Sequence, residues 1–332
     1  MKYRKKRIKV KIMNDGFLLV DKPAGITSHD VVDIIRKRFS TKKVGHSGTL
    51  DPFATGLLIL GINKGTKLLE YLQHQNKKYY VKAKLGIITD TYDITGEIKE
   101  KYNPEKIHIE KLKEIILSFK GKYMQVPPMY SARKYNGKKL YELAREGKII
   151  KMPPKEVEIY SIENIKISEN GTFEFECEVS SGTYIRSLIM DIGYKSGIGA
   201  VTMELRRLKI GKFKIEDSVK LDDISDIIPL FEMLSFPSVL LNEKGIQRAL
   251  NGNHIFLEHV EKYEEFKKGE FISLIDKEKN LIAVAIAERN SKFLNTLEKH
   301  GKNERVFKIK KVLYHIECLK SQIHSGSSIA NP

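Results

Sequence analysis

The sequence predicts an α+β fold, in which a large domain on a mostly antiparallel mixed sheet precedes a small β-rich domain. Strict alternation of apolar and polar residues is typical of strands at 77–86 and 172–179. Helical patterns at 27–39 and 103–121 occur among such strands without the regular alternation of a parallel α/β sheet. The composition changes near 225–240, which indicates a hinge before a smaller unit.

The first elements along the chain are a strand, a helix and a second strand. "GFLLV" at 16–20 predicts a short buried strand, which the turn "DKPAG" ends. Thr27 or Ser28 can cap the following helix, because a short oxygen-bearing side chain accepts from the free backbone N–H groups there. "LLILGI" at 57–62 predicts another buried strand after a glycine-rich loop.

The middle of the chain supplies most of the expected sheet. Tyr79 and Val81 share the apolar face of the strand at 77–86. Asn103 is the expected cap of the helix at 103–121, and we expect the basic, aromatic segment 123–152 to be irregular. Further expected elements are paired strands at 155–167 and 172–186, a helix at 187–197, and strands within 270–288 and 304–313.

The balance of charge indicates a polyanionic partner. The 332 residues include 59 Lys and Arg against 42 Asp and Glu, which gives a net charge of +17. Such an excess favours nucleic-acid binding, although a solvated Lys-rich surface also accounts for it.

Other classes of protein are disfavoured by composition. Cys177 and Cys318 are too few for a metal cluster or a disulfide framework, and the pattern around Cys177 predicts core packing. No stretch is apolar for long enough to span a membrane. The N-terminal "MKYRKKRIKVKI" has seven basic residues in twelve, but no apolar segment follows, so it does not read as a signal peptide. We expect a cytoplasmic protein that uses no metal and no membrane.

The most informative carboxylate is Asp51, which stands alone in the glycine-rich stretch "VGHSGTLDPFATGLLIL" at 44–60. Glycines let the backbone of another molecule approach closely. A turn aspartate that caps a backbone group is the common alternative. A lone carboxylate argues against a paired-carboxylate glycosidase, and the missing Lys-Ser/Thr argues against a nucleotide P-loop. His46 and Asp51 could be metal ligands, but no third ligand follows nearby.

Several collinear blocks resemble the B-type tRNA pseudouridine synthases, a family that modifies the T loop of tRNA. "GHSGTLDPFATGLL" resembles the catalytic motif of this family, and "DKPAGITSHDVV" resembles its N-terminal motif. "KKYYVKAKLGIITDTYDITGEI" is similar to its Tyr-bearing strand and acidic loop, and "QVPPMYSARKYNGKKLYELAREG" to its RNA-gripping insertion. "SSGTYIRSLIMDIG" and "MELRRLKIGKF" are similar to its late motifs, so the resemblance covers most of the first 215 residues.

The resemblance implies a domain organisation. A catalytic domain of the pseudouridine synthase type is expected at 15–236, with the RNA-gripping insertion at about 123–152. A PUA-like RNA-binding domain is expected at 237–318. A basic extension at 1–14 and a tail at 319–332, expected to be disordered, lie outside the family core.

The resemblance also implies roles for individual residues. Asp51 is the implied catalytic carboxylate, Tyr79 the ring that stacks on the target base and a candidate for moving the C5 proton, and Arg186 the partner that places Asp51. The implied substrate- or RNA-binding residues are His46, Lys22, Tyr184, Leu205, Arg133, Lys134 and Lys138. Core packing of Tyr79 or Leu205 and phosphate binding by Arg186 are the alternative interpretations.

The implied reaction converts a uridine in the T loop of tRNA, at tRNA position 55, to pseudouridine by base flipping. The N1–C1′ bond is replaced by a C5–C1′ bond with no net gain or loss of atoms, so we expect no cofactor. We expect a monomer that binds the T stem-loop. An RNA-binding or tRNA-folding protein and a guide-RNA-dependent synthase subunit remain alternatives, and the insertion favours the stand-alone bacterial type.

Overall fold

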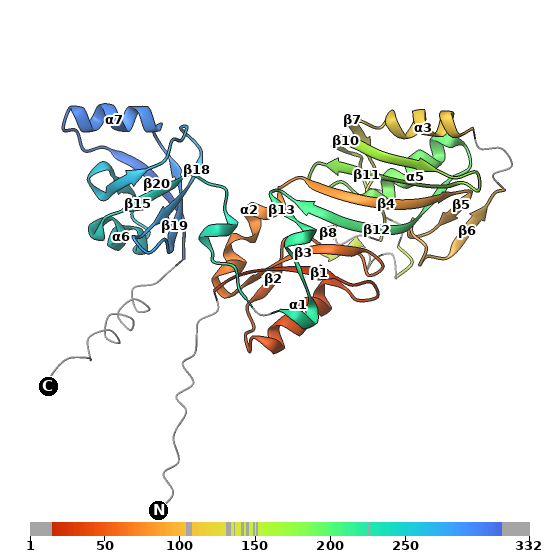
Figure 1. Ribbon diagram of the computed structural model, residues 1–332, viewed down its shortest axis with the longest axis horizontal. Helices are drawn as coiled ribbons and strands as arrows, with labels where there is room; N and C mark the ends of the chain where they lie inside the picture. Colours follow the sequence, from red (N-terminus) through yellow and green to blue (C-terminus); the bar gives the residue numbers. More distant parts are fainter. Residues whose placement is uncertain are drawn as a thin grey trace, which may run out of the picture. The chain divides into compact units, whose positions relative to one another are not determined.

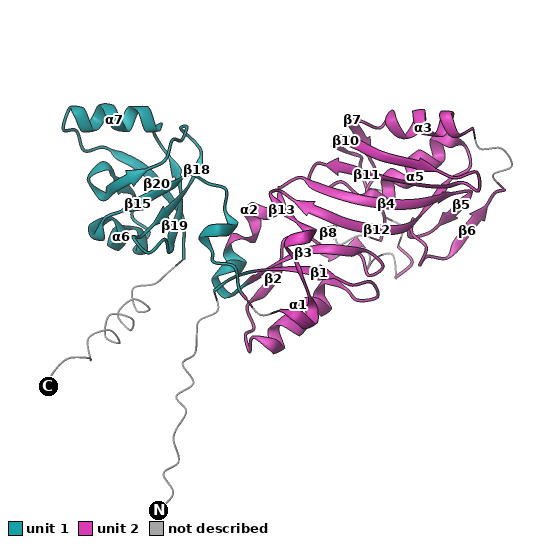
Figure 2. Ribbon diagram, viewed as in Figure 1, with its two compact units in different colours: residues 1–17, 62–67, 227–332 teal, residues 18–61, 68–226 magenta. Residues whose placement is uncertain are grey.

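In the computed structural model the chain divides into two units, each with its own hydrophobic core (Figures 1 and 2). One unit comprises residues 1–17, 62–67 and 227–332, and the other comprises 18–61 and 68–226. The domain ranges expected from the sequence stay predictions. The structure describes residues 15–103, 108–130, 134, 135, 137–140, 143, 146–148, 150, 152–224 and 226–313.

A ten-stranded sheet forms the centre of the larger unit, with the strand order β14-β1-β3-β12-β4-β11-β10-β7 and with β2 and β13 paired at its side. The strands of the main path are β14 (Val219–Lys220), β1 (Gly16–Lys22), β3 (Thr55–Ile62), β12 (Ala200–Ile210), β4 (Lys77–Leu85), β11 (Thr172–Val179), β10 (Lys155–Ile167) and β7 (Gly121–Gln125). The side strands are β2 (Val44–His46) and β13 (Phe213–Lys214).

Most pairings in this sheet are antiparallel. The central strand β4 runs antiparallel to both β11 and β12. β12 runs parallel to β3, and β1 runs parallel to β14. The predicted α+β class on a mostly antiparallel mixed sheet is therefore confirmed.

The alternation in β4 and β11 places one face of each strand in the core. Tyr79 and Val81 on β4 are buried, and Cys177 on β11 pairs in register with Tyr79. Cys177 is buried as a free thiol, as its position in the strand pattern predicted. Burial raises the pKa of this thiol to about 12, which keeps it neutral and unreactive at ordinary pH.

The helices of this unit begin at caps that the sequence partly identified. Thr27 caps α1 (Ser28–Arg38) in a reciprocal capping box with Asp30, which confirms one of the two predicted caps. The helix predicted at 103–121 is shorter, because α3 (Ile109–Leu117) begins after His108 rather than after Asn103. The remaining α-helices of this unit with described bounds are α2 (Leu69–Gln73) and α5 (Ile185–Ser196).

The strand expected at 172–186 is too long. It ends at Val179, and a turn with Gly182 at a positive φ of 82° leads into α5. A positive φ strains residues that carry a Cβ atom, so this glycine suits a sharp reversal. Arg186 consequently lies in the first turn of a helix instead of at the end of a strand.

The segment 123–152 is more regular than expected where the structure describes it. Gly121–Gln125 forms the strand β7, which pairs antiparallel with β10 at the edge of the sheet. The short strands β8 (Lys134–Tyr135) and β9 (Lys138–Lys139) form an antiparallel hairpin.

The smaller unit is rich in β structure, as predicted. Its six-stranded sheet has the order β16-β20-β19-β18-β15-β17. The strands are β16 (Ile255–Phe256), β20 (Arg305–Val312), β19 (Leu281–Ala287), β18 (Phe271–Ile275), β15 (Ser238–Leu241) and β17 (Val260–Tyr263). The described α-helices that accompany this sheet are α6 (Glu243–Leu250) and α7 (Ser291–Lys299). In the described part of the chain, every helix is too short or too polar to cross a membrane.

Candidate active site

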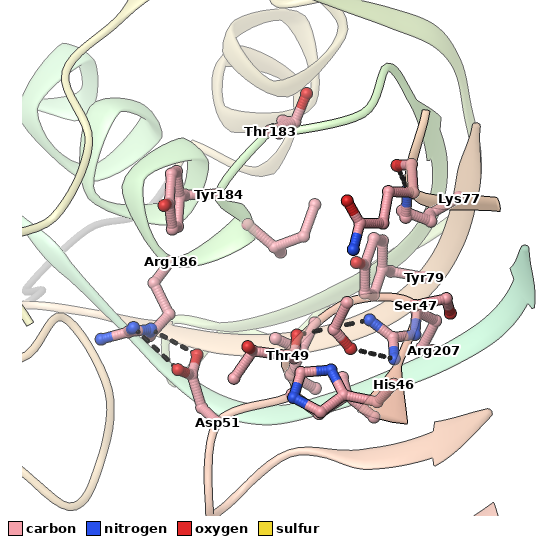
Figure 3. Close-up of a pocket in the computed structure, with 16 residues that line it drawn as sticks. His46, Ser47, Thr49, Asp51, Lys77, Tyr79, Thr183, Tyr184, Arg186 and Arg207 are labelled. Carbon is pink, nitrogen blue, oxygen red and sulfur yellow. Dashed lines mark hydrogen bonds and ion pairs between the residues drawn. The ribbon is translucent and has the colours of Figure 1, made fainter. Parts of the chain in front are cut away.

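A cavity of about 460 Å³ opens in the larger unit, where the loop after β2 meets β4, β12 and the turn before α5 (Figure 3). Its walls bring together residues from four separate stretches of sequence. Six of the predicted site residues line it: His46, Asp51, Tyr79, Tyr184, Arg186 and Leu205.

The loop that carries Asp51 is fixed on both sides of this residue. The Leu50 N–H donates to Ser28 Oγ over 2.9 Å, and Ser28 Oγ donates to the Leu50 carbonyl over 3.1 Å. The Pro52 carbonyl accepts from the Gly25 N–H over 2.8 Å. The turn before α1 and the first residue of α1 therefore hold Asp51 in place by its two neighbours.

Lys22 also fixes this loop, through hydrogen bonds to backbone carbonyls. Its ammonium is buried and donates to the carbonyls of Pro23, Ile26 and Pro52, at 2.7, 2.8 and 3.3 Å. Burial lowers the pKa of Lys22 to about 8, an effect that the nearby Asp51 carboxylate opposes. Lys22 is not among the residues that line the cavity, which corrects its expected position, because loop carbonyls engage its ammonium group.

Arg186 and Asp51 form a two-point ion pair. Arg186 Nε lies 2.8 Å from Asp51 Oδ2, and Arg186 NH2 donates to Asp51 Oδ1 over 3.0 Å. Figure 3 shows the guanidinium of Arg186 reaching toward the Asp51 carboxylate at one end of the cavity. Planar, two-point pairs of this kind fix orientation as well as charge. The pairing implied by the sequence resemblance is present in the structure.

The Arg186 guanidinium also binds two backbone carbonyls and a second carboxylate. Arg186 NH1 donates to the Thr91 carbonyl over 2.6 Å and lies 3.3 Å from Asp93 Oδ2. Arg186 NH2 donates to the Tyr130 carbonyl over 2.8 Å. With only 4% of its side chain exposed, Arg186 is held by partners on every side.

Asp93 is a functional candidate that the sequence reasoning missed. Its buried carboxylate accepts from the Thr95 N–H at 3.0 Å and from the hydroxyls of Thr91 and Thr95 at 3.0 and 2.5 Å. The signal that could have identified it is the pattern Thr-x-Asp-x-Thr at 91–95, because flanking threonines supply donors to a central carboxylate.

The ionisation of Asp51 is set by opposing effects. Burial raises the pKa of this carboxyl above its ordinary value, and the charge of Arg186 opposes that shift. The negative charge of Asp93 raises the pKa further, and the charge of Lys22 lowers it. Desolvation outweighs the opposing charge of Arg186, so the carboxyl binds a proton more readily than a free aspartate does.

Tyr79 and Leu205 form a buried apolar part of the cavity. Both are 7% exposed, and both belong to the hydrophobic core of the unit as well as to the cavity wall. Tyr79 projects from β4, and Leu205 from the neighbouring strand β12. These side chains therefore pack in the core and line the cavity at the same time.

Arg207 was also missed by the sequence reasoning. Its buried guanidinium donates to the carbonyls of Leu57, Thr49 and Gly48, at 2.7, 3.4 and 3.1 Å, and it lines the cavity. Arg207 thus shapes the same loop that carries Asp51. It lies two residues after Leu205 on β12, so strand periodicity places both on the cavity side.

The predicted RNA-binding residues of the insertion do not line the cavity where they are described. Lys138 is exposed, and its Nζ lies 3.2 Å from Glu146 Oε1. Lys134 belongs to β8, but its side chain lies outside the described structure, as does Arg133.

Comparison with known proteins places these features in one family. Residues 36–185 match the N-terminal domain of the TruB family pseudouridylate synthases, and residues 186–234 match the C-terminal domain of tRNA pseudouridylate synthase B. The tRNA pseudouridine synthase B of Thermotoga maritima is 50% identical over 307 residues, which cover 90% of this chain and 99% of the relative. The protein of the same name from Thermosipho melanesiensis is 49% identical over 308 residues, covering 91% and 99%.

Solved structures give a consistent result. A chain in the structure of an H/ACA RNP bound to a substrate RNA containing 2′-deoxyuridine has a TM-score of 0.68 at 25% identity, covering 91% of this chain and 86% of that chain. A chain of a Cbf5-Nop10-Gar1 complex has a TM-score of 0.67 at 26% identity, covering 92% and 87%. The fold is that of the pseudouridine synthases. Within that class, the chain belongs to the TruB family.

Proposed function

We propose that this protein isomerises the uridine at position 55 of tRNA, in the T loop, with Asp51 as the catalytic carboxylate. As a TruB family member at about 50% identity to tRNA pseudouridine synthases B, the protein is an enzyme that converts uridine in tRNA to pseudouridine. The observation that carries the assignment of Asp51 is its two-point ion pair with Arg186 at the wall of the cavity.

The cavity suits a base that has left its stack. Extrusion of a nucleotide costs about a few kcal/mol, and stacking on an aromatic ring returns about 1–3 kcal/mol per base. Tyr79 is the buried ring in the cavity wall, and Leu205 supplies apolar surface beside it. We infer that the uracil lies against Tyr79, close to the Asp51 carboxylate. His46 and Tyr184, at other points of the wall, would then help to hold the flipped nucleotide.

The chemistry requires one carboxylate and no added group. The N1–C1′ bond breaks, the uracil turns, C5 bonds to C1′ and loses its proton, and N1 takes up a proton, either that one or one from solvent. Asp51 in its ionised form can attack the nucleotide or stabilise positive charge that develops at the sugar. Arg186 orients the carboxylate and favours its charged form. Tyr79, with its hydroxyl at the cavity, is the candidate for moving the C5 proton.

We propose that the chain acts as a monomer in the cytoplasm without metal or cofactor, and that the unit after residue 237 binds RNA. The reason for expecting no cofactor is chemical, because an isomerisation needs no external oxidant, reductant or group donor. The expected partner of the insertion at 123–152 is the T stem-loop, gripped by basic residues such as Lys138.

A guide-RNA-dependent synthase subunit is the main rival function. The solved H/ACA and Cbf5 chains share 25–26% identity with this chain, whereas the tRNA pseudouridine synthases B of Thermotoga maritima and Thermosipho melanesiensis share 50% and 49%. That difference favours stand-alone action. A protein that only binds or folds tRNA is the second rival, and the Asp51–Arg186 pair favours the enzyme over it, because binding alone does not need a carboxylate in the cavity.

The deciding experiment uses the purified chain and an unmodified tRNA transcript labelled with tritium at C5 of uridine. Formation of pseudouridine releases this tritium, so release from position 55 without any guide RNA supports the proposal. A matched transcript with cytidine at position 55 is the control. Tritium release that persists in the control transcript would assign the activity to another uridine, and no release without added guide RNA would favour the rival functions.

A further inference from the structure

We infer that Gln125 is a positioning residue for the proposed reaction, because its side chain clamps the backbone of Tyr184 and so fixes the turn that carries Arg186. The inference rests on the proposed function. Gln125 is the last residue of β7, at the base of the insertion, and only 1% of it is exposed. It does not line the cavity that holds Asp51.

The contact is a two-point amide clamp. Gln125 Nε2 donates to the Tyr184 carbonyl over 3.0 Å, and the Tyr184 N–H donates to Gln125 Oε1 over 2.8 Å. The Gln125 amide therefore satisfies both backbone groups of one residue, as a neighbouring strand would. Tyr123 lies next to this clamp, and its hydroxyl is hydrogen-bonded to Gln125 Nε2. A side chain bound at both ends of its amide has one orientation in the structure.

The clamped residue begins the helix that carries Arg186. Tyr184 is the N-cap of α5, it has no side-chain capping bond of its own, and Arg186 is the second residue of the helix. A shift of the Tyr184 backbone therefore also shifts the backbone of Arg186, and with it the guanidinium group. The two-point pair between Arg186 and Asp51 depends on orientation, so even a small displacement weakens it.

Two more contacts join the same pair of segments. Ser187 Oγ donates to the Val126 carbonyl over 2.9 Å, and Arg186 NH2 donates to the Tyr130 carbonyl over 2.8 Å. Residues 125–130 thus run along the start of α5 and bind it at Tyr184, Arg186 and Ser187. Because this stretch lies at the start of the insertion, Gln125 ties the base of the insertion to the arginine that orients Asp51.

The test compares Gln125→Met, which keeps the length and removes the amide, with Gln125→Glu, which keeps the acceptor for the Tyr184 N–H and loses the donor. Ser196→Ala is the matched control, because it removes a 2.7 Å hydrogen bond to Gly193 at the opposite end of the same helix. Each variant is measured for kcat, for Kd of tRNA, for the pH dependence of kcat, and for amide hydrogen exchange at residues 184–187.

We expect Gln125→Met to lower kcat by about ten- to hundredfold, with Kd for tRNA changed less than about twofold. Exchange at 184–187 should rise. The acid limb of the kcat profile should move to higher pH. Burial and the charge of Asp93 raise the pKa of Asp51, and a displaced Arg186 lowers that pKa less, while the effect of Lys22 is unchanged. Gln125→Glu should also lower kcat, because its carboxylate cannot donate to the Tyr184 carbonyl and is buried beside it. Ser196→Ala should leave kcat and the acid limb at wild-type values.

Unchanged exchange at 184–187 in Gln125→Met would overturn the clamp. A wild-type kcat and acid limb in that variant, despite faster exchange, would overturn its role in positioning Arg186. An equal loss of kcat in Ser196→Ala would also overturn the positioning role of Gln125, because general weakening of α5 would then explain the loss of kcat in Gln125→Met. Hydrogen exchange needs no turnover, so it decides the clamp even if the wild-type chain proves inactive on tRNA, an outcome that would refute the proposed function instead.

Discussion

Asp51 and Arg186 lie 135 residues apart in the sequence and form a two-point ion pair with N–O distances of 2.8 and 3.0 Å. The carboxylate comes from a loop between two strands, and the guanidinium comes from the first turn of α5. The pair is asymmetric in exposure, since 31% of the Asp51 side chain is exposed against 4% of the Arg186 side chain. Arg186 is therefore part of the framework, and Asp51 is the group of the pair that a substrate can reach.

The first prediction concerns the carboxylate itself. Asp51→Asn keeps the size of the side chain and removes its charge, so it should abolish pseudouridine formation. Binding of tRNA should be largely retained, because affinity for RNA comes mainly from phosphate contacts. Tritium release and filter binding on the same transcript measure the two effects. Turnover of Asp51→Asn near the wild-type rate would remove Asp51 from the catalytic role.

The second prediction concerns the other carboxylate on Arg186. Asp93→Asn removes the negative charge from a buried, hydrogen-bonded group, which costs about 1–3 kcal/mol in comparable cases. If half of that loss reaches the transition state, kcat falls by about two- to thirteenfold. Asp90→Asn is the control in the same loop, since the Asp90 carboxylate accepts from the Glu97 N–H. Equal kinetics for the Asp90 and Asp93 variants would show that Asp93 only shapes the loop.

The third prediction concerns pH. Burial raises the pKa of Asp51, and the reaction needs the ionised form, so kcat should fall as the pH drops through that raised value. The acid limb should therefore lie above the pKa of about 3.9 of a free aspartate. Arg186→Lys keeps a charge but loses the planar two-point contact, so its acid limb should move to higher pH and its kcat should drop. An acid limb unmoved in Arg186→Lys would mean that another group titrates.

The fourth prediction separates the two roles of Tyr79. Tyr79→Phe keeps the ring that fills the core and faces the cavity, and it removes only the hydroxyl. Binding and thermal stability should stay close to wild type while turnover slows, if the hydroxyl moves the C5 proton. Tyr79→Leu should also lose stacking, which is worth about 1–3 kcal/mol. A wild-type rate in Tyr79→Phe would limit Tyr79 to packing and stacking.

The fifth prediction concerns the smaller unit. Truncation after residue 236 should raise KM for whole tRNA and flatten its dependence on salt, with kcat changed much less, because distant phosphate contacts add affinity without chemistry. A T-arm stem-loop should be affected less than whole tRNA. Thermal unfolding of the truncated chain controls for misfolding. In a folded truncated chain, equal losses on both substrates would contradict this division of labour.

Local patterns in the sequence were enough to predict several elements of the fold. The alternation at 77–86 predicted β4 and the buried face that holds Tyr79, because side chains of a strand alternate strictly between two faces. Thr27 identified the start of α1, because capping depends on residues within one turn. The start of α3 was placed too early, because the sequence signal at Asn103 and Pro104 does not reveal where hydrogen bonding begins.

The sequence by itself determined the strand faces, one helix cap and, through its collinear motifs, the family and the pairing of Asp51 with Arg186. Only the tertiary structure decided that Asp93 shares Arg186 with Asp51, that Lys22 binds the loop that carries Asp51, and that Arg207 binds the carbonyls of that loop. The physical reason is the range of the interactions. Strand and cap patterns depend on neighbours within a few residues. The partners of a buried arginine are distant in sequence, and they come close to it only because β3, β12 and β4 pair in this order in the sheet.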